Sequence, residues 1–293
     1  MPPEPAPSAP ILCIGALNRD LIARHDGPLP AGADRPGRIE ARAGGVAFNV
    51  ARALAREGLA VALLAALGSD AEGAALATEA AAEGIDTAGL IRMPGRASDR
   101  YLAIEAGGRL HAAIADTATL EAAGPRILAA VGAWPAGPAA LTVIDGNLPV
   151  PVLEALARAP RLGAVALVSA GDGKAARLAG FFHRPATRFH LNRTEAEALL
   201  ARPLADAATA ARALRDAGAH EALVTDGAAT LAWAAPEGTL RRDPPPARAR
   251  QATGAGDRLL ASLIAALYRG ADRAAALDAA LAAARAHVEG ETA

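Results

Sequence analysis

The segment Gly254-Ala255-Gly256-Asp257 combines the residue types that phosphoryl transfer needs, and it runs directly into an apolar helical pattern. Glycines let the main chain approach an anion without a Cβ clash, and a helix N-terminus presents N–H groups and partial positive charge to that anion. A carboxylate at the same point can accept the proton of an attacking hydroxyl. We therefore expect Asp257 to act as general base and the N–H groups of Gly254, Ala255 and Gly256 to form an anion hole. The alternative, an ordinary helix start with an acid in its first turn, stays open.

Other segments of the sequence predict the elements that must position these groups. Apolar runs typical of strands cover 11–14, 60–65, 141–144, 165–168, 188–191 and 222–225. Helical patterns lie between them, at about 48–57, 71–83, 150–158, 174–181, 193–200 and 205–217. This alternation predicts a doubly wound α/β fold, with a mostly parallel sheet and helices on both faces. Ligands of such sheets bind outside the carboxyl ends of the strands.

Two segments interrupt the alternation and predict a small β-sheet lid. Residues 20–41 are rich in Gly, Pro and charged residues, and two runs of period 2 flank Ala106-Gly107-Gly108, which is a hairpin signal. We place the lid segments at about 16–43 and 97–116. The remaining chain reads as a single domain over 11–293, preceded by a Pro- and Ala-rich leader at 1–10 that we expect to be disordered.

The composition excludes several classes of protein. A net charge of −1 over 293 residues gives no electrostatic footprint for nucleic acid or an anionic membrane. The single cysteine, Cys13, lies in an apolar run and reads as a buried thiol. No apolar run is long enough to span a membrane and no signal peptide is apparent, so we expect a cytoplasmic protein.

A second glycine pair, Gly44-Gly45, opens the helix that carries Asn49, about 200 residues before the first motif. The two motifs in this order resemble the ribokinase (PfkB) family of carbohydrate and nucleoside kinases. Within that family the chain is most similar to the pseudouridine kinases, over nearly its whole length. The similarity rests on four further stretches, at 15–20, 36–39, 143–147 and 192–197, together with the lid hairpin.

The resemblance implies ATP-dependent phosphorylation of the 5′-hydroxyl of pseudouridine, with Mg²⁺ and a possible monovalent cation such as K⁺ as cofactors. It also implies a lid that closes over the nucleoside and pairs with a second lid in a homodimer. The implied substrate-binding residues are Asn18, Asp20, Gly44, Gly45, Asn49 and Asp257. The implied nucleotide-binding residues are Asn192, Thr225, Gly227, Gly254, Gly256 and the only lysine, Lys174, while Glu195 and Asn192 would organise Mg²⁺ through waters.

Simpler interpretations of these residues also stay open. Asn18 and Asp20 are typical of a turn after a strand, and Thr225 with Gly227 is typical of a turn that ends one. Asn192 and Glu195 have the spacing of a helix cap.

Departures from the family pattern leave the function open too. Gln251, Arg258 and the stretch 168–174 differ from that pattern. Two alternatives to a pseudouridine kinase therefore stay open: a kinase for another sugar or nucleoside, such as ribose or adenosine, and a catalytically weak nucleoside-binding protein.

Overall fold

The computed structural model describes residues 10–134, 141–247 and 254–290, so the proposed leader lies outside the described residues except for Pro10. Its centre is a sheet of eight strands in the order β14-β13-β12-β11-β10-β9-β1-β4. Their bounds are β1 (Ile11–Ile14), β4 (Val61–Leu64), β9 (Leu141–Asp145), β10 (Ala164–Val168), β11 (Thr187–Asn192), β12 (Glu221–Asp226), β13 (Ala229–Ala235) and β14 (Gly238–Arg242). All neighbours from β4 to β12 are parallel, and β13 and β14 continue the sheet antiparallel.

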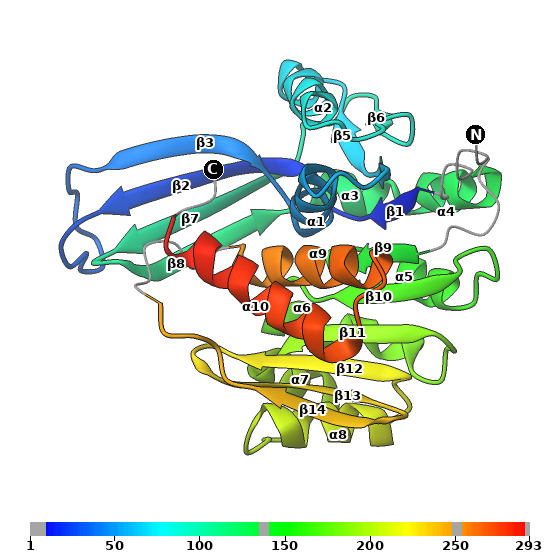
Figure 1. Ribbon diagram of the computed structural model, residues 1–293. Helices are drawn as coiled ribbons and strands as arrows, with labels where there is room; N and C mark the ends of the chain where they lie inside the picture. The colour runs from blue at the N-terminus through cyan, green and yellow to red at the C-terminus, as the bar shows by residue number, and fades with distance from the viewer. Residues whose placement is uncertain (1–9, 135–140, 248–253, 291–293) are drawn as a thin grey trace, which may run out of the picture.

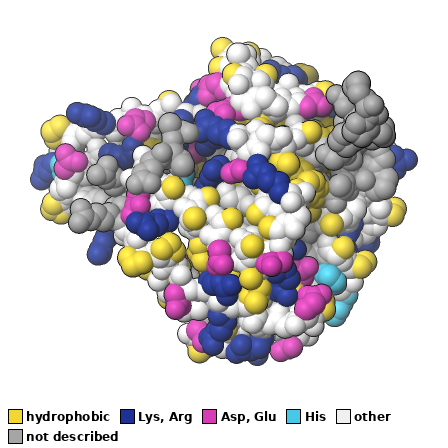
Figure 2. All heavy atoms as spheres, viewed as in Figure 1, with side chains coloured by type: hydrophobic (Ala, Val, Ile, Leu, Met, Phe, Trp, Pro, Cys, Tyr) yellow, Lys and Arg dark blue, Asp and Glu magenta, His cyan; other side chains and the backbone are white. Residues whose placement is uncertain are grey.

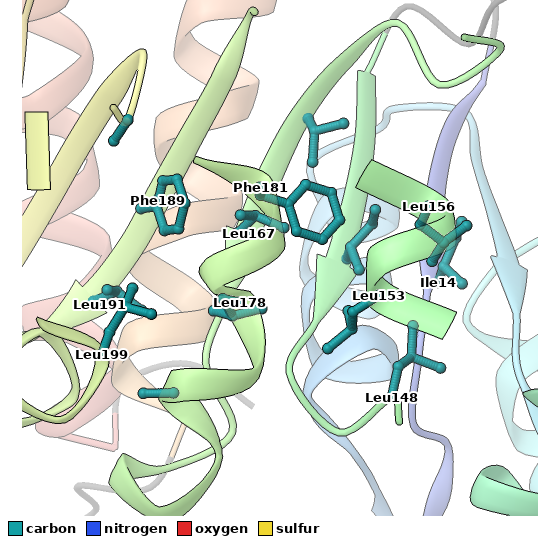
Figure 3. Close-up of a cluster of buried hydrophobic side chains, with 14 of the residues drawn as sticks. Ile14, Leu148, Leu153, Leu156, Leu167, Leu178, Phe181, Phe189, Leu191 and Leu199 are labelled. Carbon is teal, nitrogen blue, oxygen red and sulfur yellow. The ribbon is translucent and has the colours of Figure 1, made fainter. Parts of the chain in front are cut away.

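Helices cover both faces of this sheet, which explains why its parallel strands read as continuous apolar runs. One face buries Leu153, Phe181 and Phe189 in a cluster drawn in Figure 3. The elements on that face are α3 (Ala118–Ala122), α4 (Gly124–Ala133), α5 (Val150–Ala157), η1 (Ala176–Phe181), α7 (Arg193–Leu200) and α8 (Ala207–Asp216). The other face packs against α1 (Val46–Arg56), α9 (Ala255–Tyr268) and α10 (Arg273–Val288). The doubly wound fold predicted from the sequence is confirmed.

A separate four-stranded sheet, the lid sheet, projects from one side of the central sheet (Figure 1). Its strand order is β3-β2-β7-β8, with β2 (Asn18–His25), β3 (Arg38–Gly44), β7 (Arg100–Ala106) and β8 (Arg109–Asp116). The turn between β7 and β8 uses Gly107 and Gly108, both at positive φ, as the hairpin signal predicts. At the base of the lid sheet lie β5 (Ala66–Gly68), β6 (Ile91–Met93) and α2 (Ala71–Ala82). A small extra sheet is therefore present beside the main one.

Predicted helices and strands agree closely with the structure where hydrophobic periodicity is strong. The helix expected at 193–200 is α7 with the same bounds, and the helix expected at 174–181 divides into α6 (Asp172–Ala175) and η1. The sequence patterns do not predict the hairpin of β13 and β14. The ends of the segment 20–41, which we expect to belong to the lid, form parts of β2 and β3. Charged side chains of both signs are interspersed over the face shown in Figure 2, in keeping with the small net charge.

Candidate active site

The two glycine turns converge, although they lie far apart in the chain. Gly45 precedes α1 and Gly254 precedes α9, and each has a positive φ, of 104° and 88°. The helices pack side by side, so the Asn49 side chain donates from Nδ2 to Oδ2 of Asp257 at 3.2 Å, across 208 residues of sequence. The side-chain amide that follows the Gly44-Gly45 pair therefore contacts the carboxylate that follows Gly254 and Gly256.

Asp257 lies in the first turn of α9 and is only partly exposed. Withdrawal from water raises the pKa of its carboxyl to about 7, because the charged form loses hydration. The hydrogen bond from Asn49 acts in the opposite direction, as does the positive charge of Arg52, while the charges of Asp145 and Glu195 raise the pKa further. A carboxylate with a pKa near neutrality is suited to accept a proton and later release it.

A pocket of about 490 Å³ opens beside Asp257, at the carboxyl ends of β10, β11 and β12. Its lining includes Gly254 and Gly256 at the start of α9, and Thr225 and Gly227 at the end of β12. Other residues of its lining are Ser169, Asn192, Arg193, Thr194, Glu195 and Asp226. These polar groups surround a space large enough for a small phosphorylated ligand, at the position where such sheets bind ligands.

Asn192 and Glu195 form a helix cap at the wall of this pocket. The Asn192 side chain accepts from the backbone N–H of Glu195 at 2.9 Å, and Glu195 accepts from the backbone N–H of Asn192 at 2.8 Å. The second Glu195 oxygen accepts from the N–H of Gly171 at 3.2 Å. The capping interpretation is thus correct, and a role in organising Mg²⁺ stays a prediction.

The polar residues predicted to bind the acceptor substrate gather at the base of the lid sheet. Asn18 and Asp20 are buried, and Asn18 Nδ2 donates to Asp20 Oδ1 at 2.8 Å. Gly44 lies opposite Asn18 in the paired strand, where a Cβ would stand 2.2 Å from the Asp20 carboxyl. A Cβ on Gly45 would stand 2.4 Å from the Ala16 carbonyl oxygen, so both glycines allow the lid base to close on α1. This cluster lies at the start of the helix that carries Asn49.

Asp145, a residue for which the sequence suggested no role of its own, organises this region. It is fully buried at the end of β9, where Oδ2 accepts from the N–H groups of Ala16 at 2.8 Å and Ala47 at 3.0 Å. Oδ1 accepts from the N–H of Asn147 at 2.6 Å. Burial raises the pKa of Asp145, and these three bonds act in the opposite direction. One carboxyl therefore fixes the loop after β1, the start of α1 and the turn after β9.

Lys174 and Arg258 each have a partner that the sequence did not indicate. The Lys174 ammonium donates to Asn147 Oδ1 at 2.7 Å, outside the described lining of the pocket, so its contact with nucleotide stays a prediction. Arg258 follows the proposed base but turns away from it, and its Nη2 lies 3.0 Å from Glu57 Oε1. Arg258 therefore forms an ion pair with Glu57, the residue after the last turn of α1. Gln251 lies outside the described residues.

Comparison with known proteins agrees with this fold. The chain belongs to the pfkB family of carbohydrate kinases, whose pattern matches residues 8–293. A curated relative, an uncharacterized sugar kinase YeiI of Escherichia coli (strain K12), is 36% identical over 116 residues, which is 39% of this chain and 32% of that protein. The chain thus aligns with only about a third of the length of this relative.

Two solved structures illustrate the likeness of the fold. A carbohydrate kinase from Agrobacterium tumefaciens is 29% identical with a TM-score of 0.76, covering 94% of this chain and 89% of that one. A ribokinase from Arabidopsis thaliana, solved with ribose and ATP, is 20% identical with a TM-score of 0.79, covering 96% and 93%. None of the described helices is long and apolar enough to cross a membrane.

Proposed function

We propose that this pfkB-family kinase phosphorylates the 5′-hydroxyl of pseudouridine with ATP, forming pseudouridine 5′-phosphate. The observation that carries the proposal is the contact between Asn49 and Asp257, because it joins the polar cluster at the lid base to the pocket at the strand ends. An acceptor bound at the lid base and a nucleotide bound in the pocket would meet at the Asp257 carboxyl. The choice of pseudouridine rests on the sequence stretches shared with the pseudouridine kinases, of which the block at 192–197 is among the longest.

In the proposed reaction, each side of Asp257 has a separate task. Asn18, Asp20 and Asn49 hold the ribose hydroxyls and direct the 5′-oxygen at the γ-phosphate. Asp257 takes the proton of that oxygen as it bonds to the γ-phosphorus, the bond from that phosphorus to the β,γ-bridging oxygen breaks, and ADP leaves. The N–H groups of residues 254–256 stabilise charge on the equatorial phosphate oxygens. Thr225 and Gly227, at the end of β12, contact the nucleotide phosphates. The lid sheet excludes water, which protects the γ-phosphate from hydrolysis.

Glu195 and Asn192 are the residues that would hold Mg²⁺ through waters. No group of three or more His, Cys, Asp or Glu side chains within the described ranges could hold a metal directly. Mg²⁺ commonly keeps several waters and uses one or two carboxylates together with phosphate oxygens, and Glu195 at the pocket wall fits that mode. When bound, the ion would neutralise charge on the phosphates.

A panel of acceptors tests the proposal. The protein is incubated with ATP, Mg²⁺ and either pseudouridine, uridine, adenosine, ribose or 2′-deoxypseudouridine, and phosphorylated products are measured by mass spectrometry. We expect pseudouridine to give the highest kcat/KM and the deoxy analogue to lose at least about 100-fold, because polar groups at the lid base are left unpaired. A higher kcat/KM for ribose or adenosine would show that this compound, and not pseudouridine, is the preferred acceptor. Absence of product with every acceptor would favour the catalytically weak nucleoside-binding protein.

We further propose that two copies associate through the lid sheet. Leu21, Leu102 and Ile114 lie opposite one another in neighbouring strands, on the face away from Asp20. Ile39 shares that face and is 73% exposed, and Ile114 is 68% exposed, so an apolar surface is open to solvent. Sedimentation of the wild type and of Ile114→Asp tests this: we expect a dimer for the wild type and a monomer for the variant, and a monomeric wild type contradicts it.

A further inference from the structure

Arg52 stands beside the proposed catalytic pair without contacting Asp257. It lies in α1, one turn after Phe48 and Asn49. Its Nη2 donates to Asn49 Oδ1 at 3.1 Å, and its guanidinium carbon lies 5.1 Å from the centroid of the Phe48 ring. Phe48 is fully buried, so the ring is a fixed surface on which the guanidinium rests. The Arg52 side chain therefore lies toward the preceding turn of α1, where it contacts the amide of Asn49.

This contact determines which end of the Asn49 amide faces Asp257. An asparagine amide has one accepting end and one donating end, and the two ends have nearly the same shape. A guanidinium has only donors, whereas an ionised carboxylate has only acceptors. With Arg52 on the Oδ1 side, the Nδ2 side points at Asp257, at 3.2 Å. The opposite orientation would set a carbonyl oxygen against the carboxylate and leave Arg52 facing an NH₂ group.

We infer that Arg52 is a positioning residue: by binding Asn49 Oδ1 it holds the amide so that Nδ2 stays on Asp257 and keeps the carboxylate aligned with the acceptor hydroxyl. The inference rests on the proposed kinase activity but not on pseudouridine as the acceptor. It assigns Arg52 an effect on turnover through Asn49, with no contact to the substrate.

The charged groups around Asp257 and Arg52 affect the pKa of Asp257, and therefore the pH dependence of turnover. Asp257 is faced by Asp145 from β9, Glu195 from α7 and Arg52 from α1, and the positive charge of Arg52 lowers the pKa of Asp257. Arg52 itself is faced by Arg42 from the lid sheet, by Arg56 from the next turn of α1 and by Glu83 at the end of α2. Loss of Arg52 should therefore move the acid limb of the pH profile upward, in addition to any effect on orientation.

A double-mutant cycle separates the two effects. Arg52→Met, Asn49→Ala and the double variant are compared with the wild type at pH 9, about two units above the pKa of Asp257 in the wild type, and each kcat is corrected to full ionisation of Asp257 with the variant's own pH profile. The matched control is Arg56→Met, because Arg56 is the next arginine on the same helix and binds Glu83 at 2.8 Å on the surface. The acceptor is whichever compound of the panel the wild type phosphorylates best.

We expect kcat at pH 9 to fall about tenfold or more in Arg52→Met, as for the loss of a hydrogen bond to a charged group, while KM for ATP changes little. In the Asn49→Ala background the same substitution should cost less than about twofold, because its effect passes through the amide. Arg52→Lys should restore part of the loss, and Arg56→Met should match the wild type. Unchanged turnover in Arg52→Met at pH 9, or an equal loss with and without Asn49, overturns the inference.

A second measurement does not depend on catalysis. The side-chain NH₂ resonances of Asn49 in a ¹⁵N-labelled protein should follow the ionisation of Asp257 between about pH 6 and pH 8. In Arg52→Met this response should shrink, because the amide is no longer held on the carboxylate. An unchanged response in the variant contradicts the positioning role even if every acceptor in the panel fails, so the two proposals fail separately.

Discussion

Replacing Asp257 with Asn removes the proposed proton acceptor but keeps the size of the side chain and an oxygen that Asn49 can bind. In the wild type the pKa of Asp257 is about 7, so the base is about 90% ionised at pH 8 and about 10% ionised at pH 6. We therefore expect wild-type kcat to rise with pH through neutrality, with its midpoint near pH 7. For Asp257→Asn we expect a kcat about 10²- to 10⁴-fold lower and nearly independent of pH over the same range.

The same substitution should increase stability at alkaline pH. A carboxyl whose pKa is higher in the folded than in the unfolded protein retains its proton on folding, so its contribution to stability is fully present below about pH 4 and is lost as pH rises to about 7. At pH 8 the wild type thus carries a partly desolvated charge that the Asp257→Asn variant lacks. At pH 8 we expect the free energy of unfolding of the variant, measured by urea titration, to be about 1 to 2 kcal/mol higher than that of the wild type. Near pH 4 the two should be equally stable.

The assay couples ADP formation to absorbance, with ATP binding measured separately by calorimetry. ATP affinity should stay within about twofold of the wild type, since the pocket at the strand ends is intact. A variant that keeps wild-type kcat, or one whose kcat still rises through pH 7, would show that another group takes the proton. A loss of ATP affinity equal to the loss of kcat would show that position 257 binds nucleotide instead of acting as base.

Three further substitutions test the structure around the site. Glu57→Gln weakens the ion pairs that join the end of α1 to α9, so we expect a loss of about 1 to 2 kcal/mol in urea unfolding. Glu154→Gln, in an exposed pair, should change stability by less than about 0.5 kcal/mol, and equal effects contradict a stabilising role of the partly buried pair. Gly45→Ala places a Cβ 2.4 Å from the Ala16 carbonyl oxygen at a φ of 104°, so it should cost more than about 2 kcal/mol, and a stable variant would mean that this turn can relax. Glu195→Gln removes an acceptor from a carboxyl that binds two backbone N–H groups, so the Mg²⁺ concentration for half-maximal activity should rise severalfold, and an unchanged Mg²⁺ titration would leave Glu195 with the capping role alone.

The sequence predicts the parts of the fold that local patterns encode. Most residues of the buried parallel strands are apolar, and the helices between them repeat apolar residues at helical spacing, so both are predicted within a few residues of their bounds. The strand β13 is not predicted because it is mostly alanine, and alanine suits either face of a strand or a helix. The sequence assigns β2 and β3 to a lid but does not predict their bounds, because the segment that connects them is rich in Gly and Pro.

The candidate site is predictable only where one segment carries its own chemistry. Asp257 and Asn49 stand out because glycines mark the turns before them. The role of Asp145 cannot be predicted in this way. Its carboxyl accepts hydrogen bonds from N–H groups that lie 129 and 98 residues away in the sequence, and no local pattern indicates such contacts. The partner of Arg258 is similarly remote, 201 residues away at Glu57, so the sequence leaves open where that cation points.

The 208 residues that separate Asn49 from Asp257 also set an order of events during synthesis. At about 5 to 20 residues per second, the ribosome makes the helix that carries Asp257 roughly 10 to 40 s after the helix that carries Asn49. Throughout that interval the nascent chain has the residues proposed to bind the acceptor but neither the carboxylate nor the N–H groups that α9 supplies. A growing polypeptide therefore cannot transfer phosphate from ATP, and the activity begins only when the C-terminal helices dock.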